Sequence, residues 1–318
     1  MQISDQISLN VFEKIKNKLN NYYPRDKKSL MGQPILYNND ANNLIKNAFS
    51  MNESFMLSRL GTTETEVIKH FLFNKNKFPD YLLKKINMLS GVFPPNQKIL
   101  TQFAETYIDA LQHIDILGVR SSKSEYYFLW ENEKKVLKKT LKKKVHFLDL
   151  ESIDPFFFED PWTKYLSGKK VLIIHPFKST IESQLQKIGI HEHNKNFLPA
   201  FNYELIQTIQ SLDSSYNANY TDWFEALDFM SSQIRKKDFD IALIAGGAYG
   251  LPLAKVCKHL NKQVMHIGGS LQLYFGILGR RWEGNETNFS VMFNSKWVRP
   301  HKNETPINKH KIENSCYW

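Results

Sequence analysis

An arginine, a glycine and a glutamate follow one another closely in the stretch RLGTTETE, residues 59 to 66. A guanidinium neutralises phosphate and a carboxylate recruits a divalent metal ion, so Arg59 and Glu64 together suit a nucleotide diphosphate. Gly61 permits a tight turn that would project both side chains toward one crevice. These residue types in this order predict an anion-binding site, and the competing explanation is a simple ion pair between Arg59 and Glu64.

The same stretch carries a complete signal for the start of a helix. Thr63 and Glu66 match the S/T-x-x-E capping box, which gives Glu66 a structural role. Glu64 is also favoured in a first helical turn, because the helix macrodipole is positive there. On this signal alone, we expect a well-capped helix over residues 64–71 after a strand over residues 54–60.

Glycine pairs come directly after two apolar runs in the C-terminal half. Gly246 and Gly247 follow DIALIA, and Gly268 and Gly269 follow QVMHI. Glycine after a strand lets backbone N–H groups approach a ligand closely, and the N-terminus of the next helix adds positive potential. Neither turn matches the dinucleotide fingerprint or the P-loop. The glycines therefore predict a phosphate-binding edge, with tight strand-to-helix turns as the alternative.

A histidine and an arginine pair complete the set of candidates. His175 comes directly after the apolar run VLII, either as a catalyst or as a structural hydrogen-bonding residue. Arg280 and Arg281 precede Trp282, and this trio suits a diphosphate and a stacked base. The alternative for the trio is a basic surface pair beside a core tryptophan.

These candidate residues lie where strands are expected to end. Short apolar runs alternate with amphipathic segments, which is typical of an α/β protein with a mainly parallel sheet and helices on both faces. Consecutive strand-to-helix units imply right-handed crossovers and a Rossmann-like arrangement, in which ligands bind beyond the carboxyl ends of the strands. The expected strands cover residues 54–60, 114–120 and 144–150, and the expected strand–helix units cover residues 169–188, 238–260 and 262–278.

An irregular connection divides the chain. The segment DPFFFEDPW, residues 154–162, combines prolines and acids that interrupt regular structure. We therefore expect an N-terminal α/β half over residues 1–151 and a C-terminal Rossmann-like half over residues 152–318, with one continuous domain as the alternative. The aromatic C-terminal arm is expected to pack back on the body, since Tyr317 and Trp318 would otherwise be exposed.

Charge and composition limit the class of protein. The chain has 318 residues, 42% of them hydrophobic, and a net charge of +10, so it can bury a full core and attract phosphorylated molecules or an anionic membrane surface. Seven lysines fall within KKVLKKTLKKK, residues 134–144. An amphipathic helix with a solvated lysine face is the simplest interpretation, and contact with acidic lipid is the alternative. Nucleic acid is not expected, because no zinc-finger, homeodomain or RNP pattern accompanies the charge.

Cysteine content and hydropathy indicate the compartment. Cys257 and Cys316 form neither a disulfide framework nor a metal-site spacing, which fits a reducing cytoplasm. The N-terminal residues lack the apolar core of a signal peptide, and no run approaches the ~18 apolar residues of a spanning helix. We therefore expect a cytoplasmic protein, with peripheral contact at the inner face of the membrane as a further expectation.

The stretch RLGTTE resembles the signature of the D-type glycosyltransferases (GT-D fold), which is an arginine, a glycine and an Asp-x-Glu at one strand-to-helix turn. Arg59, Gly61 and Glu64 match this signature, and Thr62 stands where the family has its first acid. The resemblance implies nucleotide-sugar binding at this turn, with a divalent metal ion, Mn²⁺ or Mg²⁺, held by Glu64. Because Thr62 is not acidic, a single carboxylate would have to hold the metal.

Segments of the C-terminal half are similar to proteins of bacterial polysaccharide gene clusters. The shared segments are GKKVLIIHPF, IGGSLQLYFGILGRRW and ENSCYW. Together the resemblances imply that the chain moves a sugar from a nucleoside diphosphate sugar to a saccharide or glycolipid acceptor. The arginines at the site would stabilise the leaving diphosphate. An inverting reaction would also need a base, for which Glu64, Glu66 and His175 are the candidates.

Two other functions stay open. A non-catalytic carbohydrate-binding or assembly component is favoured by Thr62 in place of an acid. A sugar-nucleotide oxidoreductase would need bound NAD, and the missing dinucleotide fingerprint argues against it. Nucleotide-sugar binding without turnover would indicate the first function, and NAD absorbance in the purified protein would indicate the second.

Overall fold

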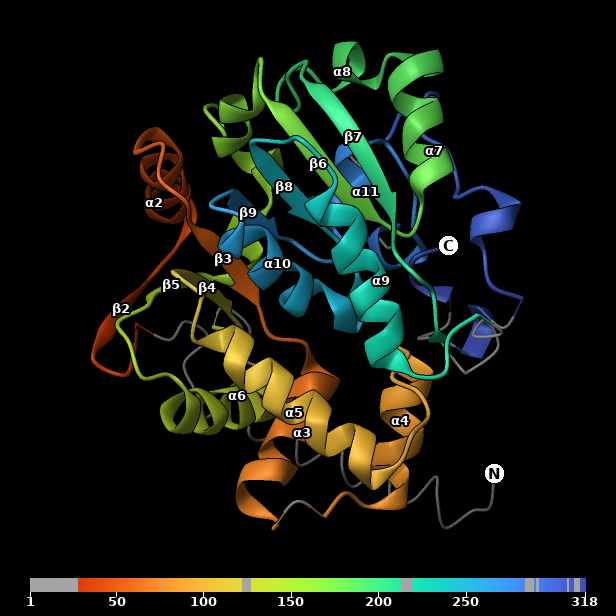
Figure 1. The fold of residues 1–318 in the computed structure, drawn as a ribbon. Coiled ribbons are helices and arrows are strands. Elements are labelled where there is room, and N and C mark those ends of the chain that lie inside the picture. The colour runs from red at the N-terminus through yellow and green to blue at the C-terminus, as the bar shows by residue number, and fades with distance from the viewer. Residues whose placement is uncertain are drawn as a thin grey trace, which may run out of the picture.

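The computed structural model describes residues 28–75, 77–121, 127–212, 219–283, 289, 292–307, 309–311 and 315–318. Within these residues, nine strands form one sheet in the order β1-β2-β5-β4-β3-β9-β8-β6-β7 (Figure 1). Strands β1 and β2 pair antiparallel, and the other ladders between named strands are parallel. The expected α/β fold with a mainly parallel sheet is therefore confirmed.

The strands are short, and most come from the apolar runs of the sequence. Residues 54–60, 114–120 and 144–150 contain β3, β4 and β5, as expected. Strands β1, β2 and β7 were not predicted from the sequence. The bounds are β1 Ser29–Leu30, β2 Gln33–Leu36, β3 Met56–Arg59, β4 Ile116–Val119, β5 His146–Asp149, β6 Lys170–His175, β7 Asn202–Gln207, β8 Ile241–Ile244 and β9 Gln263–His266.

Two of the expected helices differ from prediction, and the helices over residues 38–50, 80–90, 97–111, 190–193 and 223–235 were not predicted from the sequence. The helix expected over residues 178–188 becomes a π-helix from Gln184 onward. The lysine-rich helix was expected over residues 134–144, but it covers residues 127–140. Leu141 therefore lies beyond its last turn. The bounds are α2 Asn38–Ser50, α3 Thr62–Phe73, α4 Asp80–Ser90, α5 Gln97–Leu111, α6 Tyr127–Thr140, α7 Lys178–Ser183, α8 Ile190–His193, α9 Trp223–Arg235, α10 Gly250–His259 and α11 Leu271–Tyr274.

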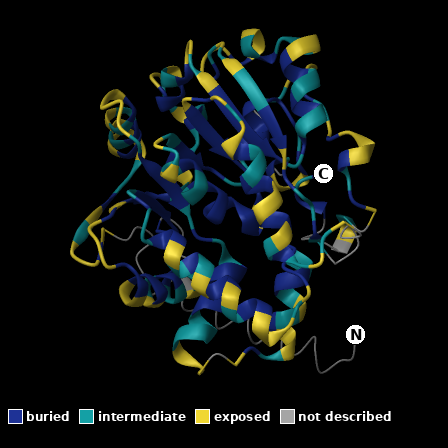
Figure 2. Ribbon diagram, viewed as in Figure 1, coloured by how far each residue is buried: buried dark blue, intermediate teal, exposed yellow. Residues whose placement is uncertain are grey.

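Helices cover both faces of the sheet. Along β8, Ala242 and Ile244 face one hydrophobic cluster, while Ile241 and Leu243 face the other. This alternation follows from the two-residue period of a strand. The first cluster contains residues of α3, α4, α5, α6, α9 and α10, and the second contains residues of α2, α7, α8 and α11. Figure 1 shows α3, α4, α5 and α6 grouped below the sheet, and Figure 2 shows the buried central strands.

The sheet is continuous across the expected division at residues 151 and 152. Strand β3 of the N-terminal half pairs with β9 of the C-terminal half, in the register Met56 to Val264 and Leu57 to Met265. Residues 154–162 contain the 3₁₀ turn Pro155–Phe157 and lead into a second 3₁₀ turn, Trp162–Leu166. Among the described residues, no helix is long and apolar enough to cross a membrane.

Candidate functional site

A cavity of about 260 Å³ opens at the carboxyl edge of the sheet. Its place follows from the directions that the helices take. Strands β3 and β9 are neighbours, but α3 packs on one face of the sheet and α11 on the other. Strands β8 and β6 are also neighbours, and α10 and α7 diverge in the same way. Helices that leave adjacent parallel strands toward opposite faces open a crevice between them, where ligands bind in such sheets.

The cavity gathers ten of the eleven site residues predicted from the sequence. Arg280 is the exception, because it lines a second cavity with Glu283 and Arg299. The predicted base contact of Trp282 is also wrong, because this side chain is buried against Leu273 and Trp297. The residues brought together in the main cavity are Arg59, Gly61, Thr62, Glu64, His175, Gly246, Gly247, Gly268, Gly269 and Arg281.

Arg59 ends β3 and directs a guanidinium into the cavity. Gly268 lies against it with φ +85°, and a Cβ added there would stand 2.7 Å from Nη1 of Arg59. Burial lowers the pKa of Arg59, and the neighbouring cations Arg120 and Arg281 lower it further. Among the described residues, the Arg59 guanidinium forms no hydrogen bond or ion pair. It is therefore a desolvated cation that a ligand anion can reach.

Glu64 lies in the first turn of α3 and is 7% exposed. Its carboxylate folds over Gly61, where an added Cβ would stand 1.9 Å from Oε2. Within the described part of the chain, the carboxylate forms no ion pair with Arg59 and no hydrogen bond. Burial raises the pKa of the neighbouring Tyr107, and the Glu64 carboxylate raises it further. The alternative of an Arg59–Glu64 ion pair is thus wrong, and both charges face the cavity.

The predicted capping box at this helix is also wrong. Helix α3 begins at Thr62 with Gly61 as its N-cap, in extended conformation and without a side-chain cap. Glu66 instead accepts hydrogen bonds from the Tyr81 hydroxyl at 2.9 Å and from Nζ of Lys85 at 2.6 Å. Glu66 therefore ties α3 to α4, and it does not line the cavity.

Arg120 supports the turn from behind, and the sequence analysis missed it. Its side chain is 6% exposed, and Nη1 donates to the Glu133 carboxylate at 3.1 Å. Nη2 donates to the Leu60 carbonyl at 2.8 Å and to the Thr62 hydroxyl at 3.2 Å. Arg120 directly follows β4, so the rule that places sites at carboxyl ends could have found it. A buried cation therefore holds Thr62 in place behind the turn.

Two buried histidines line the cavity as neutral rings. Burial lowers the pKa of His175 to about 3, and burial together with Arg59 lowers that of His266 to about 3. The backbone N–H of Phe177 donates to Nδ1 of His175 at 2.9 Å, so the proton of the neutral ring sits on Nε2. His175 therefore presents a donor to the cavity, which disfavours its use as a base. His266, which the sequence analysis missed, lies 2.7 Å from the Ser58 hydroxyl.

The C-terminal residues close one side of the cavity. Arg281 donates to the Tyr317 hydroxyl at 3.2 Å and lies 4.9 Å from the centroid of its ring. The ring covers Gly269, where an added Cβ would stand 2.3 Å from Cε1. Trp318 is 5% exposed and packs on Phe177 with a centroid separation of 6.2 Å. The prediction that this arm packs back on the body is confirmed for residues 315–318.

The residues around the cavity fit a metal ion poorly. Glu64 is the one acidic residue among the described residues that line it. No group of three or more histidine, cysteine, aspartate or glutamate side chains suited to a metal occurs in the described ranges. Mg²⁺ and Mn²⁺ prefer several oxygen ligands, and Thr62 is already engaged by Arg120. The expected role of Glu64 as a metal ligand stays a prediction.

The chain matches no protein-family model and no curated protein. It is similar to two solved structures. One is described as a selenomethionine-substituted domain of unknown function 1792, with 11% identity, a TM-score of 0.46, and coverage of 93% of this chain and 98% of that one. The other is described as the domain of unknown function 1792 with a distinct glycosyltransferase fold, with 12% identity, a TM-score of 0.45, and coverage of 88% and 94%.

Proposed function

We propose that this protein is a glycosyltransferase that binds a nucleoside diphosphate sugar in the carboxyl-edge cavity and transfers the sugar to a saccharide or glycolipid acceptor. One observation carries the proposal. The guanidinium of Arg59 and the carboxylate of Glu64 face the same cavity, and neither has a protein partner in the described ranges. Desolvated charges without partners cost stability, so their presence in a crevice points to a ligand.

The arginine side of the cavity suits a diphosphate. Arg59 lies against Gly268, and Arg281 approaches the same region over Tyr317. Sugar transfer leaves negative charge on the departing diphosphate, and preorganised cations stabilise that charge most effectively where water is excluded. The neutral His175 adds a donor that a phosphate oxygen or a sugar hydroxyl can accept from.

The rest of the cavity suits an uncharged ring. Its lining includes Leu89, Tyr107, Ile209 and Tyr249, which offer apolar and aromatic surfaces to a base or a sugar. In an inverting reaction, a base takes the proton of the acceptor hydroxyl. We assign this role to Glu64, because His175 presents a donor and Glu66 is engaged by α4.

A non-catalytic binding component is the second candidate. Thr62 accepts a hydrogen bond from Arg120, so the signature acid is replaced by a residue with a structural partner. Turnover separates the two candidates, because a binding component would retain nucleotide sugar without releasing nucleoside diphosphate.

Contact with an anionic membrane surface also stays a proposal. Lys135, Lys138 and Lys139 of α6 are exposed, as are Lys142, Lys143 and Lys144 after it. Such a basic face would hold the protein near a glycolipid acceptor. Cosedimentation with vesicles that contain anionic lipid, compared with neutral vesicles, tests this contact.

A ligand screen tests the proposed function. Thermal melting and calorimetry of the purified protein would be followed with UDP, GDP, CDP, CMP, UDP-sugars and NAD. We expect a nucleoside diphosphate or its sugar to raise the melting temperature through binding to the folded state, and the matching nucleotide sugar to release nucleoside diphosphate in the presence of an acceptor. Stabilisation by NAD alone, or by none of these compounds, would overturn the proposal.

A further inference from the structure

We propose that arginine side chains, in place of a divalent metal ion, neutralise the donor diphosphate in this protein. Arg59 and Arg281 would contact the diphosphate, and Arg120 would act as a positioning residue behind the turn. This inference rests on the proposed function and concerns how the same cavity holds its ligand. It departs from what the resemblance to D-type glycosyltransferases implies.

The turn offers few of the oxygen ligands that a metal ion would need. A divalent cation bound at this turn would use the residue at position 62 together with Glu64, as the Asp-x-Glu signature implies. The Thr62 hydroxyl is neutral, and it already accepts a hydrogen bond from Nη2 of Arg120 at 3.2 Å. Glu64 then stands alone among the acids that line the cavity in the described part of the chain. One carboxylate is a poor site for an ion that prefers several oxygen ligands.

The turn already holds a buried positive charge. Arg120 is 6% exposed, and its guanidinium contacts both Leu60 and Thr62, so a positive charge already lies behind the position that a metal would occupy. Glu133 is fully buried and offsets part of that charge through its ion pair with Arg120. A second cation in front of Thr62 would meet residual repulsion that an anion would not.

The arginines around the cavity suit an anionic ligand. Burial lowers the pKa of Arg59 most, and Arg120 and Arg281 lower it further, which means that both of these cations repel Arg59. A diphosphate between Arg59 and Arg281 would relieve this repulsion and accept hydrogen bonds from a guanidinium that has no partner in the described structure. Arg59 and Arg281 could therefore bind a diphosphate without a metal ion.

Calorimetric titration of UDP, GDP and CDP into the protein, once in EDTA and once in manganese, tests the inference. We expect the nucleotide that binds to do so with similar affinity in both buffers. Binding that appears only with manganese would overturn the inference while leaving the proposed function intact. Binding of none of the three in either buffer would overturn both.

Four variants sharpen the test. Arg59→Ala and Arg281→Ala should each weaken binding in EDTA by about 10- to 100-fold, as expected for loss of a hydrogen bond to a charged group. Arg280→Ala is the matched control, because this neighbouring arginine lines the other cavity, and it should change affinity by less than about 2-fold. Glu64→Gln should leave binding unchanged or tighter, since it removes a negative charge. Loss of binding in Glu64→Gln, with Arg59→Ala and Arg281→Ala unaffected, would contradict the arginine assignment.

Discussion

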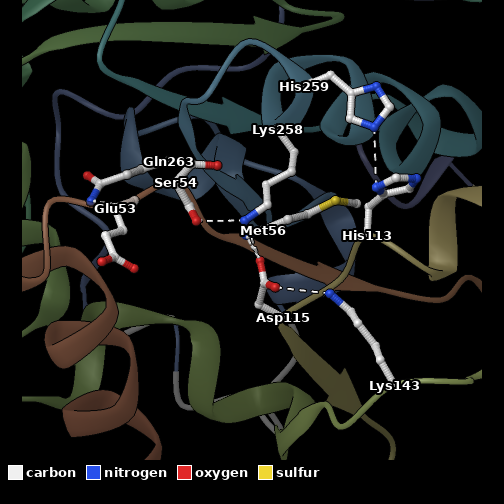
Figure 3. Close-up of polar contacts among 9 residues, drawn as sticks. All are labelled: Glu53, Ser54, Met56, His113, Asp115, Lys143, Lys258, His259 and Gln263. Carbon is white, nitrogen blue, oxygen red and sulfur yellow. Dashed lines mark hydrogen bonds and ion pairs between the residues drawn. The ribbon is translucent and has the colours of Figure 1, made fainter.

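At the amino end of the sheet, Asp115 accepts hydrogen bonds from Nζ of Lys258 at 2.8 Å, Nζ of Lys143 at 3.0 Å and the backbone N–H of Met56 at 2.8 Å (Figure 3). Lys258 also donates to the Ser54 carbonyl at 2.6 Å. Met56 begins β3, and Arg59 lies at the carboxyl end of this strand. The Arg59 guanidinium forms no ion pair or hydrogen bond in the described chain. The two ends of β3 therefore use charge in opposite ways.

We infer from this difference that the two ends of β3 have different roles. Charges that are paired at the amino end tie β3, β4 and α10 together and contribute to stability. Charges left without partners at the carboxyl end reduce stability, and proteins retain such groups where function needs them. Variants at the amino end should therefore affect folding, and variants of the unpaired charges at the carboxyl end should affect ligand binding.

Removal of the unpaired cation should have the largest effect. Under the proposed function, Arg59→Ala should lower transferase activity by about 10² to 10³-fold, because it removes a charge that would face the leaving diphosphate. The melting temperature should stay the same or rise, since the guanidinium forms no hydrogen bond or ion pair in the described chain and its repulsion from Arg120 and Arg281 is removed. Steady-state kinetics and thermal melting measure the two quantities, and full activity in a folded variant would refute the role of Arg59.

Loss of side-chain packing beside the cavity should have the next largest effect, on the stability of the protein. Trp318→Ala should destabilise the protein by about 3 kcal/mol, because it empties the space that this buried ring fills against Phe177. Urea unfolding measures the change, and Trp318→Phe, which keeps most of the volume, is the control. An unchanged midpoint for Trp318→Ala would show that the C-terminal arm contributes little.

The buried histidines predict a dependence of stability on pH. The folded pKa of His266 is about 3, below its ordinary value near 6.5, so the stability that it contributes is present above pH 6.5 and is lost as the pH falls toward 3. Between pH 7 and pH 4.5 this group alone should cost the wild type about 2–3 kcal/mol. His266→Gln retains a partner for Ser58 and should show a smaller decline in urea unfolding. An equal decline in both proteins would contradict the neutral, buried ring.

The paired carboxylate at the amino end should have a moderate effect on folding. Asp115→Asn should lower stability by about 1–2 kcal/mol, because it weakens two ion pairs that are partly exposed to solvent. Ligand affinity should not change, since Asp115 directly precedes β4 and so lies at the amino edge of the parallel sheet, opposite the cavity. Chemical unfolding and calorimetry on the same preparation give both values. A large loss of affinity would break the proposed separation of the two ends.

The smallest expected change in stability comes from Gly268. Gly268→Ala should cost about 1 kcal/mol, because the residue has φ +85° and an added Cβ would stand 2.7 Å from Arg59. The displaced guanidinium should weaken nucleotide binding as well. Gly32→Ala is a matched control, since Gly32 has φ +75° but no atom within 4 Å of an added Cβ. Equal binding by Gly268→Ala and the wild type would show that Arg59 does not need its present position.

The sequence predicted the edge of the sheet well. Apolar runs that end in glycine, arginine or histidine identify both a strand and its carboxyl end, so Arg59, His175 and Gly268 were placed in one crevice by a rule of the fold. The pairing of β3 with β9 was not predictable, because register between segments some 200 residues apart is set by packing and not by local pattern.

Predictions from the sequence were wrong where irregular backbone sets the direction of a side chain. Arg280 and Arg281 are adjacent in a 3₁₀ turn, and their side chains reach different cavities, which no helical or strand period could separate. The capping box failed because helix α3 starts earlier, at Thr62, which turns Glu66 toward α4. Arg120 directly follows β4, so the carboxyl-end rule could have found it, but its contact with Leu60, 60 residues away, could not be predicted from a local pattern.

Thermal melting of the wild type, Arg59→Ala and Asp115→Asn, each alone and with excess UDP, GDP or CDP, tests whether the unpaired charge at the carboxyl end serves ligand binding. We expect Asp115→Asn to melt lower than the wild type and to be stabilised by the same nucleotide to the same extent. We also expect Arg59→Ala to melt at or above the wild-type temperature and to be stabilised by that nucleotide less than the wild type is. A destabilised Arg59→Ala that responds to the nucleotide as strongly as the wild type would contradict this expectation, because the charge at the carboxyl end would then serve the fold and not the ligand.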